Sequence, residues 1–535
     1  MMKKQIAILG LALNTFIGSA LWAGLAPDTP GNKNDQYSSF PKYQDIGYDQ
    51  VLRPQFHFTS RKNWLNDPNG MVYSDGEWHM LFQHNALVNN TGMKSWGNAV
   101  STDLMHWTQL PHAINPYSNV LWDKGREHSI WSGSAVVDVD NILGKQKGDI
   151  KTLFALYTAT HRGADKKTAF FQGGAYSTDK GRTWSVLNGG KAIIPFQVDG
   201  VGGQRDPRIF YYAPGKFYVT IMMIGGKERA VRLWKSTDLI HWDKMFDLPN
   251  KSAECIDMYE LAVDGDPNNK KWVIADANTR YEVGEFDGKS WKGFGAVDEN
   301  DNPLKFEYGD AYYAAQAFNQ APKNRVVHVG WLRSKAGGYR PFLEAGMPFT
   351  QQMSIPAEIT LRNTPKGLRV YRMPVKEIQG LYSQSHKLGS GTPSQINAKL
   401  KDITPELIDL SIAFSPKGNA SFSIRGITID YDMASQQINF ENTERYEGEK
   451  KGWKKKDRPY PGKALSQIPA PLMDGVVKLR VLIDRASLEI FVNDGSAAGS
   501  FVVVPKPDNR SISIEGNLNV QSMEVHELKS AWDHL

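Results

Sequence analysis

Apolar and polar residues alternate with a period of two over much of this chain, and that pattern predicts strands rather than helices. In residues 477–484 and 488–492 apolar side chains are separated by single, mostly polar residues. Residues 70–73 and 78–82 form another pair of strand-like runs, joined around Asp75-Gly76, a dipeptide typical of a hairpin turn. Few segments show the period of an amphipathic helix. We therefore expect an all-β protein.

A turn motif recurs in the first two-thirds of the chain. Residues 101–107 and 236–242 read Ser-Thr-Asp-Leu-Met-His-Trp and Ser-Thr-Asp-Leu-Ile-His-Trp, and residues 177–184 carry the variant Ser-Thr-Asp-Lys-Gly-Arg-Thr-Trp. Each copy follows or joins a strand-like run, a pattern typical of propeller blades. Residues 49–360 have room for five such units. We predict a five-bladed β-propeller in which Ser and Asp hold each turn and the Trp packs between blades.

The repeat stops in the last third of the chain, although strand patterns continue. Hairpin-forming strands there end at the turn Asn493-Asp494-Gly495. A separate C-terminal β-sandwich over residues 381–535 is the simplest interpretation. Residues 361–380 are expected to link the two domains. Because that linker has no low-complexity character, we expect the domains to pack against each other.

The first residues are typical of an export signal. Lysines at positions 3 and 4 precede an apolar run at residues 6–17, and small residues follow as cleavage sites. We therefore expect a signal peptide at residues 1–26, an N-terminal extension at 27–48, and a secreted or periplasmic protein. An uncleaved membrane anchor is the alternative, but the apolar run is short for a bilayer span. No membrane span is expected once the signal is removed.

Composition narrows the choice of partners. The net charge of +6 is too small and too dispersed to indicate nucleic-acid binding. A basic cluster at residues 450–458 follows several glutamates, so we interpret it as a solvated loop. The single cysteine, Cys255, excludes an internal disulfide. The sequence shows no His/Cys/Asp cluster with metal-ligand spacing, so neither a metal nor a cofactor is expected. The oligomeric state stays open.

Three acidic motifs lie in the propeller region. Residues 63–70 read Asn-Trp-Leu-Asn-Asp-Pro-Asn-Gly, and their turn-forming residues predict that Asp67 sits in a tight turn at a strand end. A rigid carboxylate beside Trp64 suits sugar chemistry, because the carboxylate can attack or stabilise an oxocarbenium-like centre while the ring packs on the sugar. Taken alone, this motif is also compatible with an ordinary surface turn, Arg205-Asp206 with an ion-pair turn, and Glu254 with a plain surface residue.

The other two motifs are Arg205-Asp206-Pro207 and Glu254-Cys255. The neighbouring Arg205 is expected to lower the pKa of Asp206 and keep it ionised. Apolar neighbours are expected to raise the pKa of Glu254, as a general acid requires. Because the blades of a propeller bring their inner strands to one funnel, three acids on three blades can converge there.

These motifs together resemble glycoside hydrolase family 32, the invertase, inulinase and levanase group. The likeness covers about residues 49–530 and includes further motifs in the family's order. These are Phe-Gln-His-Asn at 82–85, Trp-Gly-Asn-Ala at 96–99, Trp-Ser-Gly-Ser at 131–134, Tyr-Gly-Asp-Ala-Tyr-Tyr-Ala at 308–314, Gly-Trp at 330–331 and the sandwich-domain segment 482–491.

The resemblance implies a five-bladed propeller with a β-sandwich and cleavage that retains anomeric configuration. It makes Asp67 the nucleophile, Glu254 the acid and then the base, and Asp206 the residue that holds fructose hydroxyls and stabilises the transition state. Residues at fructose-pocket positions of the family are Asn66, Gln83, Trp96, Ser132, Arg205, Asp310 and Trp331, of which Asp310 is the weakest match. Two positions depart from the common pattern: Ile256 replaces a frequent proline and Trp131 a frequent phenylalanine. Neither change removes a catalytic group.

The resemblance implies a β-fructosidase that removes terminal fructose from a fructan, levan or inulin, with sucrose as a further substrate, and the signal-like N-terminus makes it an exported one. The Lys-Asn-Trp start of the first motif looks more like microbial fructanases than plant enzymes. An endo-acting levanase or inulinase and a transfructosylase are alternatives on the same scaffold. A sialidase-like propeller is an alternative that the turn at residues 177–184 would fit, but the arginine cluster that binds a sialic-acid carboxylate is not evident in this sequence. A non-catalytic carbohydrate-binding protein is another alternative, but such a protein has no need of the acid triad. For the sandwich, a structural role is favoured over polymer binding.

Overall fold

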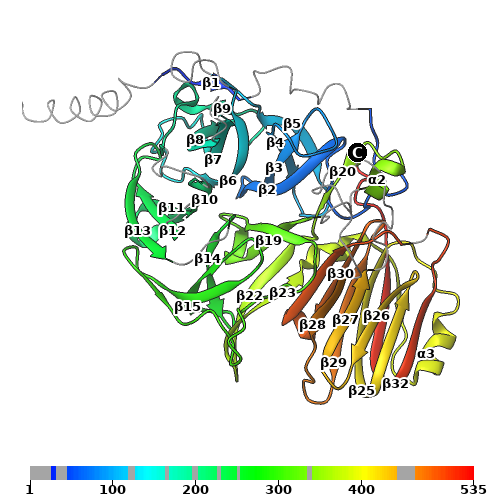
Figure 1. The fold of residues 1–535 in the computed structure, drawn as a ribbon. Helices are drawn as coiled ribbons and strands as arrows, with labels where there is room; N and C mark the ends of the chain where they lie inside the picture. Colours follow the sequence, from blue (N-terminus) through cyan, green and yellow to red (C-terminus); the bar gives the residue numbers. More distant parts are fainter. Residues whose placement is uncertain are drawn as a thin grey trace, which may run out of the picture.

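The computed structural model describes residues 26–31, 45–118, 127–162, 168–195, 203–225, 230–249, 254–333, 340–442, 464–505 and 507–535. The expected signal peptide (except Ala26), much of the N-terminal extension and the basic cluster lie outside these ranges. Strands dominate the described residues, which confirms the all-β prediction (Figure 1).

Five groups of four antiparallel strands surround a central axis and form the predicted propeller (Figure 1). The first blade is β2 (Asn63–Ser74), β3 (Glu77–Asn85), β4 (Ser95–Ser101) and β5 (Thr108–Ile114); the second is β6 (Ser129–Val137), β7 (Leu153–Arg162), β8 (Thr168–Ser177) and β9 (Ser185–Val186); the third is β10 (Arg205–Tyr212), β11 (Phe217–Ile224), β12 (Ala230–Ser236) and β13 (Asp243–Pro249); the fourth is β14 (Asp257–Val263), β15 (Asp266–Ala275), β16 (Tyr281–Phe286) and β17 (Trp291–Gly293); the fifth is β18 (Tyr312–Ala317), β19 (Val326–Leu332), β22 (Ala357–Thr364) and β23 (Gly367–Pro374).

Shorter elements complete the propeller. Strand β1 pairs with β9, β20 runs parallel to β2, and β21 pairs with β19. Their bounds, with those of the helical turns, are β1 (Thr29–Pro30), β20 (Phe349–Thr350), β21 (Gln352–Met353), α2 (Arg340–Glu344), η2 (Leu187–Gly190), η3 (Ala213–Gly215), η4 (Pro322–Asn324) and η5 (Lys376–Leu381).

The three recurring motifs form the same turn, between the third and fourth strands of the first three blades. In each, the aspartate accepts hydrogen bonds from backbone N–H groups of the turn, and the tryptophan Nε1 donates to a backbone carbonyl. Trp107 of the first blade stacks parallel to Phe318, which follows β18 of the fifth blade, with 6.4 Å between ring centroids. The predicted packing of this tryptophan between blades is confirmed.

Turn chemistry predicted one feature correctly and another wrongly. Asp75 and Gly76 join β2 to β3 as a two-residue hairpin turn, both with positive φ, as expected for this dipeptide. By contrast, residues 63–70 do not form a tight turn. They belong to the twelve-residue strand β2, in which Asp67 is an interior residue.

The C-terminal domain is the predicted β-sandwich. Its long strand β25 pairs with β29 through its first half and with β26 through its second half, so it takes part in both layers, and apolar side chains of both layers form the core between them. The elements are β24 (Tyr382–Lys387), α3 (Pro393–Leu400), β25 (Ile408–Ile424), β26 (Ile427–Asp432), β27 (Gln437–Asn442), β28 (Ala464–Pro469), β29 (Val477–Ile483), β30 (Ser487–Val492), η7 (Asn493–Gly495), β31 (Ala497–Val502) and β32 (Ile512–Leu528).

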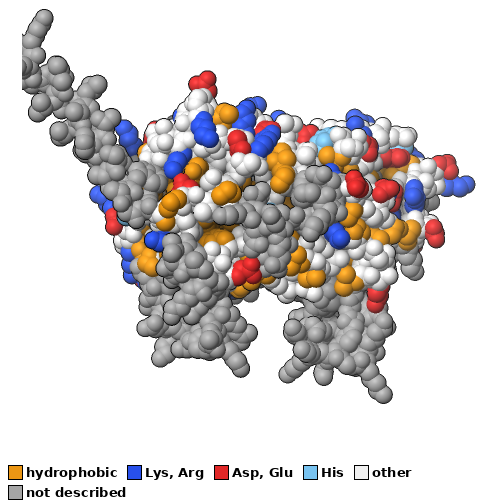
Figure 2. All heavy atoms as spheres, turned by 90° about the horizontal axis from the view of Figure 1, so that it is seen from above, with side chains coloured by type: hydrophobic (Ala, Val, Ile, Leu, Met, Phe, Trp, Pro, Cys, Tyr) orange, Lys and Arg blue, Asp and Glu red, His pale blue; other side chains and the backbone are white. Residues whose placement is uncertain are grey.

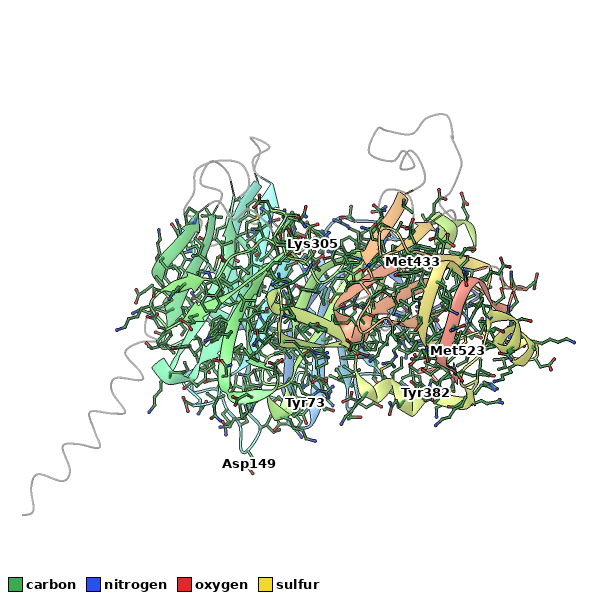
Figure 3. All side chains as sticks on the ribbon, turned by 90° about the horizontal axis from the view of Figure 1, so that it is seen from below. Tyr73, Asp149, Lys305, Tyr382, Met433 and Met523 are labelled. Carbon is green, nitrogen blue, oxygen red and sulfur yellow. The ribbon has the colours of Figure 1, made fainter. Side chains whose placement is uncertain are left out.

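The two domains lie side by side, with Tyr73 and Asp149 in the propeller and Tyr382, Met433 and Met523 in the sandwich (Figure 3). Strand β23 completes the fifth blade and ends at Pro374, so strand pairing favours a boundary near residue 375, within the segment expected to be a linker. Positive and negative side chains are interspersed on the face seen in Figure 2.

A buried network of charges joins the domains. His57 of the propeller contacts Asp484 at 2.9 Å and Glu489 at 3.0 Å, both on the sandwich. Arg372 contacts Glu489 at 2.6 Å and Glu307 at 2.5 Å. All five side chains are at most 2% exposed. This network shows that the domains are packed together, as the sequence led us to expect.

Candidate active site

The innermost strands of the blades are irregular where they begin. Pairing shifts register between Leu65 and Pro68 on β2, between Ile130 and Gly133 on β6, and between Arg205 and Arg208 on β10. A β-bulge of this kind bends the strand and re-aims side chains. The bulges contain Asp67, Ser132 and Asp206, three of the residues singled out in the sequence.

Asp67 is held by donors on both carboxylate oxygens. Oδ2 accepts hydrogen bonds from Ser132 Oγ at 2.6 Å and from Gln83 Nε2 at 3.1 Å, and Oδ1 accepts one from Asn66 Nδ2 at 3.2 Å. Gln83 also donates to Ser132 Oγ. The side chain is nearly buried, at 9% exposed. These contacts fix a buried acid near the start of β2, and they unite three of the predicted pocket residues around it.

Asp206 is buried, and its ionisation differs from the expectation. Burial raises the pKa of Asp206 to about 7, because it outweighs the lowering effect of Arg205, and the nearby carboxylates of Glu254 and Asp67 raise it further. Arg205 Nε lies 3.5 Å from Asp206 Oδ2. The predicted ion pair is present, but the prediction that it keeps the pKa of Asp206 low was wrong, since the sequence did not show how deeply this residue is buried.

Glu254 is the most exposed of the three acids. Its Oε1 accepts a hydrogen bond from the Tyr313 hydroxyl at 3.0 Å, and its Oε2 accepts one from Arg205 Nη2 at 3.2 Å. The side chain is 44% exposed. The apolar burial expected from the neighbours of Glu254 in the sequence is therefore absent, because those neighbours turn into the core while the glutamate points outward.

Cys255 brings the three acids together. Its backbone N–H donates to Asp206 Oδ2 at 3.3 Å, and its Sγ lies 3.6 Å from Asp67 Oδ2. Burial raises the pKa of the Cys255 thiol well above its usual value, so the thiol keeps its proton and can donate it. Glu254, the third acid, directly precedes Cys255 in the chain, so its backbone is one peptide unit away from the contacts of Cys255 with Asp206 and Asp67.

Aromatic side chains form one wall beside the acids. Trp64 meets Trp331 edge to face at 6.0 Å, and Tyr313 meets Trp331 at 6.3 Å. Trp96 is fully buried, and its Nε1 donates to the Trp131 carbonyl at 2.9 Å. Trp96 therefore supports Trp131 from behind and offers no exposed ring to a sugar.

Asp310 is distant in sequence from Asp67, Asp206 and Glu254 and lies in the bend before β18. The backbone N–H of the next residue, Ala311, donates to the Ser500 carbonyl of the sandwich at 3.1 Å. The bend that carries Asp310 is thus fixed from the sandwich side.

Sequence reasoning did not assign roles to three residues here. Cys255 and Tyr313 lay inside the quoted motifs, so their proximity to the acids was the only missing information. Lys94 gave no signal: its Nζ lies 5.0 Å from the centroid of the Trp131 ring. Burial lowers the pKa of Lys94, and the three carboxylates act in the opposite direction. Among the described residues, no group of three or more His, Cys, Asp or Glu side chains could hold a metal ion.

Comparison with known proteins identifies the family of this chain. The model for the glycosyl hydrolases family 32 N-terminal domain matches residues 57–374, and that for the family 32 C-terminal domain matches residues 377–529. A levanase of Bacillus subtilis (strain 168) is 32% identical over 514 residues, which cover 91% of this chain and 72% of the relative. An extracellular exo-inulinase of Aspergillus niger is 28% identical over 540 residues, covering 91% and 96%.

A solved structure gives the same result. The exo-inulinase of Aspergillus awamori superimposes with a TM-score of 0.74 at 25% identity, covering 91% of this chain and all of that one. The two family models together span the propeller and the sandwich. This chain is a member of glycosyl hydrolase family 32.

Proposed function

We propose that this chain is an exported β-fructosidase that hydrolyses terminal fructosyl units of levan- or inulin-type fructans, and also sucrose, with retention of configuration. The observation that carries the proposal is the convergence of Asp67, Asp206 and Glu254 around Cys255. The proposal draws its substrate class from relatives named levanase, exo-inulinase and fructan beta-fructosidase.

In the first step, Asp67 attacks the anomeric carbon of the terminal fructosyl unit. Its carboxylate is suited to this role because Asn66, Gln83 and Ser132 fix its orientation. Glu254 protonates the glycosidic oxygen as the bond to the leaving group breaks. A covalent fructosyl-enzyme results, and it requires the two carboxyl groups to lie about 5–5.5 Å apart.

In the second step, Glu254 takes a proton from water, and the water oxygen attacks the same anomeric carbon and displaces Asp67. Two inversions give net retention. Asp206 lies beside both acids and is placed to accept hydrogen bonds from the sugar hydroxyls. The donors around Asp67 remain in place and stabilise it as the leaving carboxylate.

The depth of the acids favours attack at a chain end. Asp67 and Asp206 lie at the bottom of the funnel, at 9% and 4% exposed, whereas the side chain of Glu254 is 44% exposed at the mouth. A terminal fructose can enter such a pocket while the rest of the chain leaves past Glu254. The endo-acting and transfructosylating alternatives predict different products.

Export is proposed from the signal-like N-terminus together with relatives named as extracellular. In the part of the chain that the structure describes, no helix has the length and apolar character needed to cross a membrane.

A product profile tests the proposal. The purified protein is incubated in parallel with levan, inulin and sucrose, and released sugars are resolved over time. We expect fructose as the sole early product from at least one fructan. A ladder of oligosaccharides would instead show endo attack, and products longer than the substrate would show transfer.

The matched control is Asp67→Asn, which keeps the size of the side chain but removes the nucleophile. We expect turnover to fall by at least about 10⁴-fold, on the scale seen when a nucleophile is removed, with an unchanged melting temperature. Substantial residual turnover in the folded variant would contradict the assignment of Asp67.

A further inference from the structure

A large cavity lies at the opposite end of the propeller axis from the acids. The innermost strands begin at the acid cluster, and the cavity is lined by residues where β10, β14 and β18 end, including Tyr212, Leu261 and Ala317. Its volume is about 880 Å³, near the upper end of the usual range for ligand sites, about 300–1,000 Å³.

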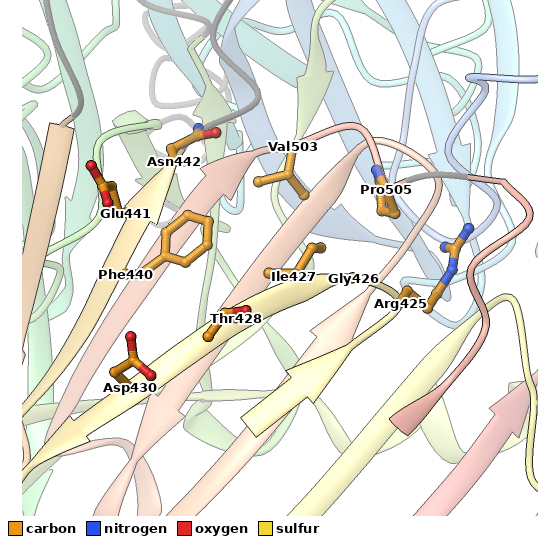
Figure 4. Close-up of a pocket in the computed structure, with 10 residues that line it drawn as sticks. All are labelled: Arg425, Gly426, Ile427, Thr428, Asp430, Phe440, Glu441, Asn442, Val503 and Pro505. Carbon is orange, nitrogen blue, oxygen red and sulfur yellow. The ribbon is translucent and has the colours of Figure 1, made fainter. Parts of the chain in front are cut away.

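A second cavity, on the sandwich, is smaller. It has a volume of about 290 Å³ between β26, β27 and the segment after β31 (Figure 4). It reaches Asn442, next to residues 443–463, which are outside the described part, and we assign it no ligand.

The floor of the propeller cavity is aromatic. Trp272 of the fourth blade packs on Phe210 at 5.1 Å and on Phe286 at 5.6 Å. Tyr212 of the third blade lies 6.3 Å from Trp272 and 5.2 Å from Phe286. Trp272 and Tyr212 are each partly exposed, while Phe210 and Phe286 beneath them are buried. Two amphipathic rings from adjacent blades thus form a platform on a rigid apolar base.

The charges around this platform are largely neutralised within the protein. Lys270 pairs with Glu260 at 3.1 Å, and Arg325 pairs with Glu358 at 3.2 Å. Buried Arg208 pairs with Asp257 at 2.6 Å. A lining of paired charges and aromatic faces suits a neutral ligand rich in hydroxyl groups better than an anion or an apolar peptide.

We propose that this cavity binds a stretch of fructan chain, as a second carbohydrate site remote from the active site. Sugar rings would pack on Trp272 and Tyr212, and the paired charged groups of the rim would bond to hydroxyls. The inference rests on the proposed function, because the polymer bound is the polymer cleaved. Holding the polymer at a second site raises the effective concentration of its chain ends near the enzyme.

Affinity electrophoresis tests the site with the full chain carrying Asp67→Asn, so that the polymer is not digested. The protein migrates through gels containing levan, inulin or dextran, with excess free fructose present to occupy the active site. We expect levan or inulin, and not dextran, to retard migration. Absence of retardation by both fructans, or equal retardation by dextran, would overturn the proposal.

Ring-removing variants locate the site. Trp272→Ala and Tyr212→Ala should each weaken retardation about tenfold, the effect of losing one well-placed aromatic contact, whereas Trp272→Phe keeps a ring and should retain part of the binding. Trp291→Ala is the matched control, because Trp291 is a partly exposed tryptophan of the same blade outside the cavity lining. Unchanged retardation in both Trp272→Ala and Tyr212→Ala would contradict the assignment.

Kinetics separate this inference from the proposed function. In an otherwise unaltered enzyme, Trp272→Ala should raise KM for the polymer. Both kcat and KM for sucrose should stay unchanged, and unchanged sucrose kinetics would also show that the variant folds. Fructan hydrolysis with no change in polymer KM would overturn the second site alone. Absence of hydrolysis by the unaltered enzyme would instead overturn the proposed function.

Discussion

At the residue scale, the three acids differ mainly in how far they reach solvent. Asp206 is the most buried, Asp67 lies slightly nearer the surface, and Glu254 is half-exposed. Burial disfavours a charged carboxylate, which explains why the pKa of Asp206 is raised to about 7 despite the adjacent Arg205. The exposed Glu254 is instead oriented by hydrogen bonds from Tyr313 and Arg205. We therefore expect loss of either partner to slow catalysis.

Replacing Tyr313 by Phe tests this orientation. Burial raises the pKa of Tyr313, so its hydroxyl keeps its proton and donates to Glu254 Oε1. In Tyr313→Phe the Glu254 carboxyl group loses that bond. We expect kcat to fall about tenfold, within the loss attributable to one hydrogen bond, and steady-state kinetics with sucrose measures the change.

The neighbouring Tyr312 provides the control. It lies on the same strand, and its ring is covered by Arg372 at 4.1 Å on the side of the sandwich. Tyr312→Phe should leave kcat unchanged. An equal fall of kcat in both variants would contradict a specific role for the Tyr313 hydroxyl.

At the element scale, the blades combine regular outer turns with irregular inner strands. Bulges at the starts of β2, β6 and β10 aim Asp67, Ser132 and Asp206 toward the axis. The outer turns, by contrast, follow a local code of Ser, Asp and Trp. We therefore expect catalysis and fold stability to depend on opposite ends of the blade and to respond to different substitutions.

Asp179→Ala should lower stability without changing catalysis. Asp179 accepts hydrogen bonds from the Thr183 backbone at 2.9 Å and from Ser177 Oγ at 2.7 Å, and so holds the turn before Trp184. Losing these bonds should reduce the free energy of unfolding by about 1–2 kcal/mol, at about 1 kcal/mol per bond. Thermal unfolding measures the change, and sucrose kinetics should stay constant.

Asp179→Asn serves as the comparison, because it keeps an acceptor oxygen and should lose less. If Asp179→Ala melts at the same temperature as the unaltered protein, these hydrogen bonds of the turn contribute nothing to stability. A fall in kcat would show that the turn affects the site.

At the scale of the whole molecule, buried charges determine how the two domains dock. Burial lowers the pKa of His57, but its hydrogen bonds to Asp484 and Glu489 outweigh burial and raise the pKa to about 9. Burial raises the pKa of Glu489, but Arg372 and His57 outweigh it and lower the pKa to about 2. Breaking such a buried network leaves uncompensated charge and costs about 3–5 kcal/mol.

These shifts predict how stability depends on pH. The contribution of His57 is complete below its unfolded pKa of about 6.5 and is lost as pH rises through about 9. The contribution of Glu489 is complete above about 4.5 and is lost as pH falls through about 2. The melting temperature should therefore be highest between about pH 4.5 and 6.5.

The variant His57→Gln checks the assignment. It should melt at a lower temperature, because Asp484 loses its cation and Glu489 keeps only Arg372, and its melting temperature should decline less between pH 6.5 and 9.5. A melting temperature of the unaltered protein that stays constant over that alkaline range would contradict the role of His57.

The sequence by itself determined the elements and the class of fold. Strand alternation, the Asp75-Gly76 turn and the repeated Ser-Asp-Trp turn depend on neighbouring residues only, so local chemistry was enough to predict them. The motifs around Asp67, Asp206 and Glu254 also indicated the family. Local reasoning failed at residues 63–70, where turn-forming residues lie within a bulged strand because β3 and β20 pair on both sides of it.

Only the tertiary structure decided what surrounds each acid. It set the burial of Asp206 and the exposure of Glu254. It also brought Cys255 and Tyr313 into contact with acids that belong to other blades. Their separation in the chain is large, and no local pattern encodes which of them meet. Long-range packing also set the burial that shifts the pKa of Asp206 and His57, because a pKa depends on the charges and solvent around a group rather than on its sequence neighbours.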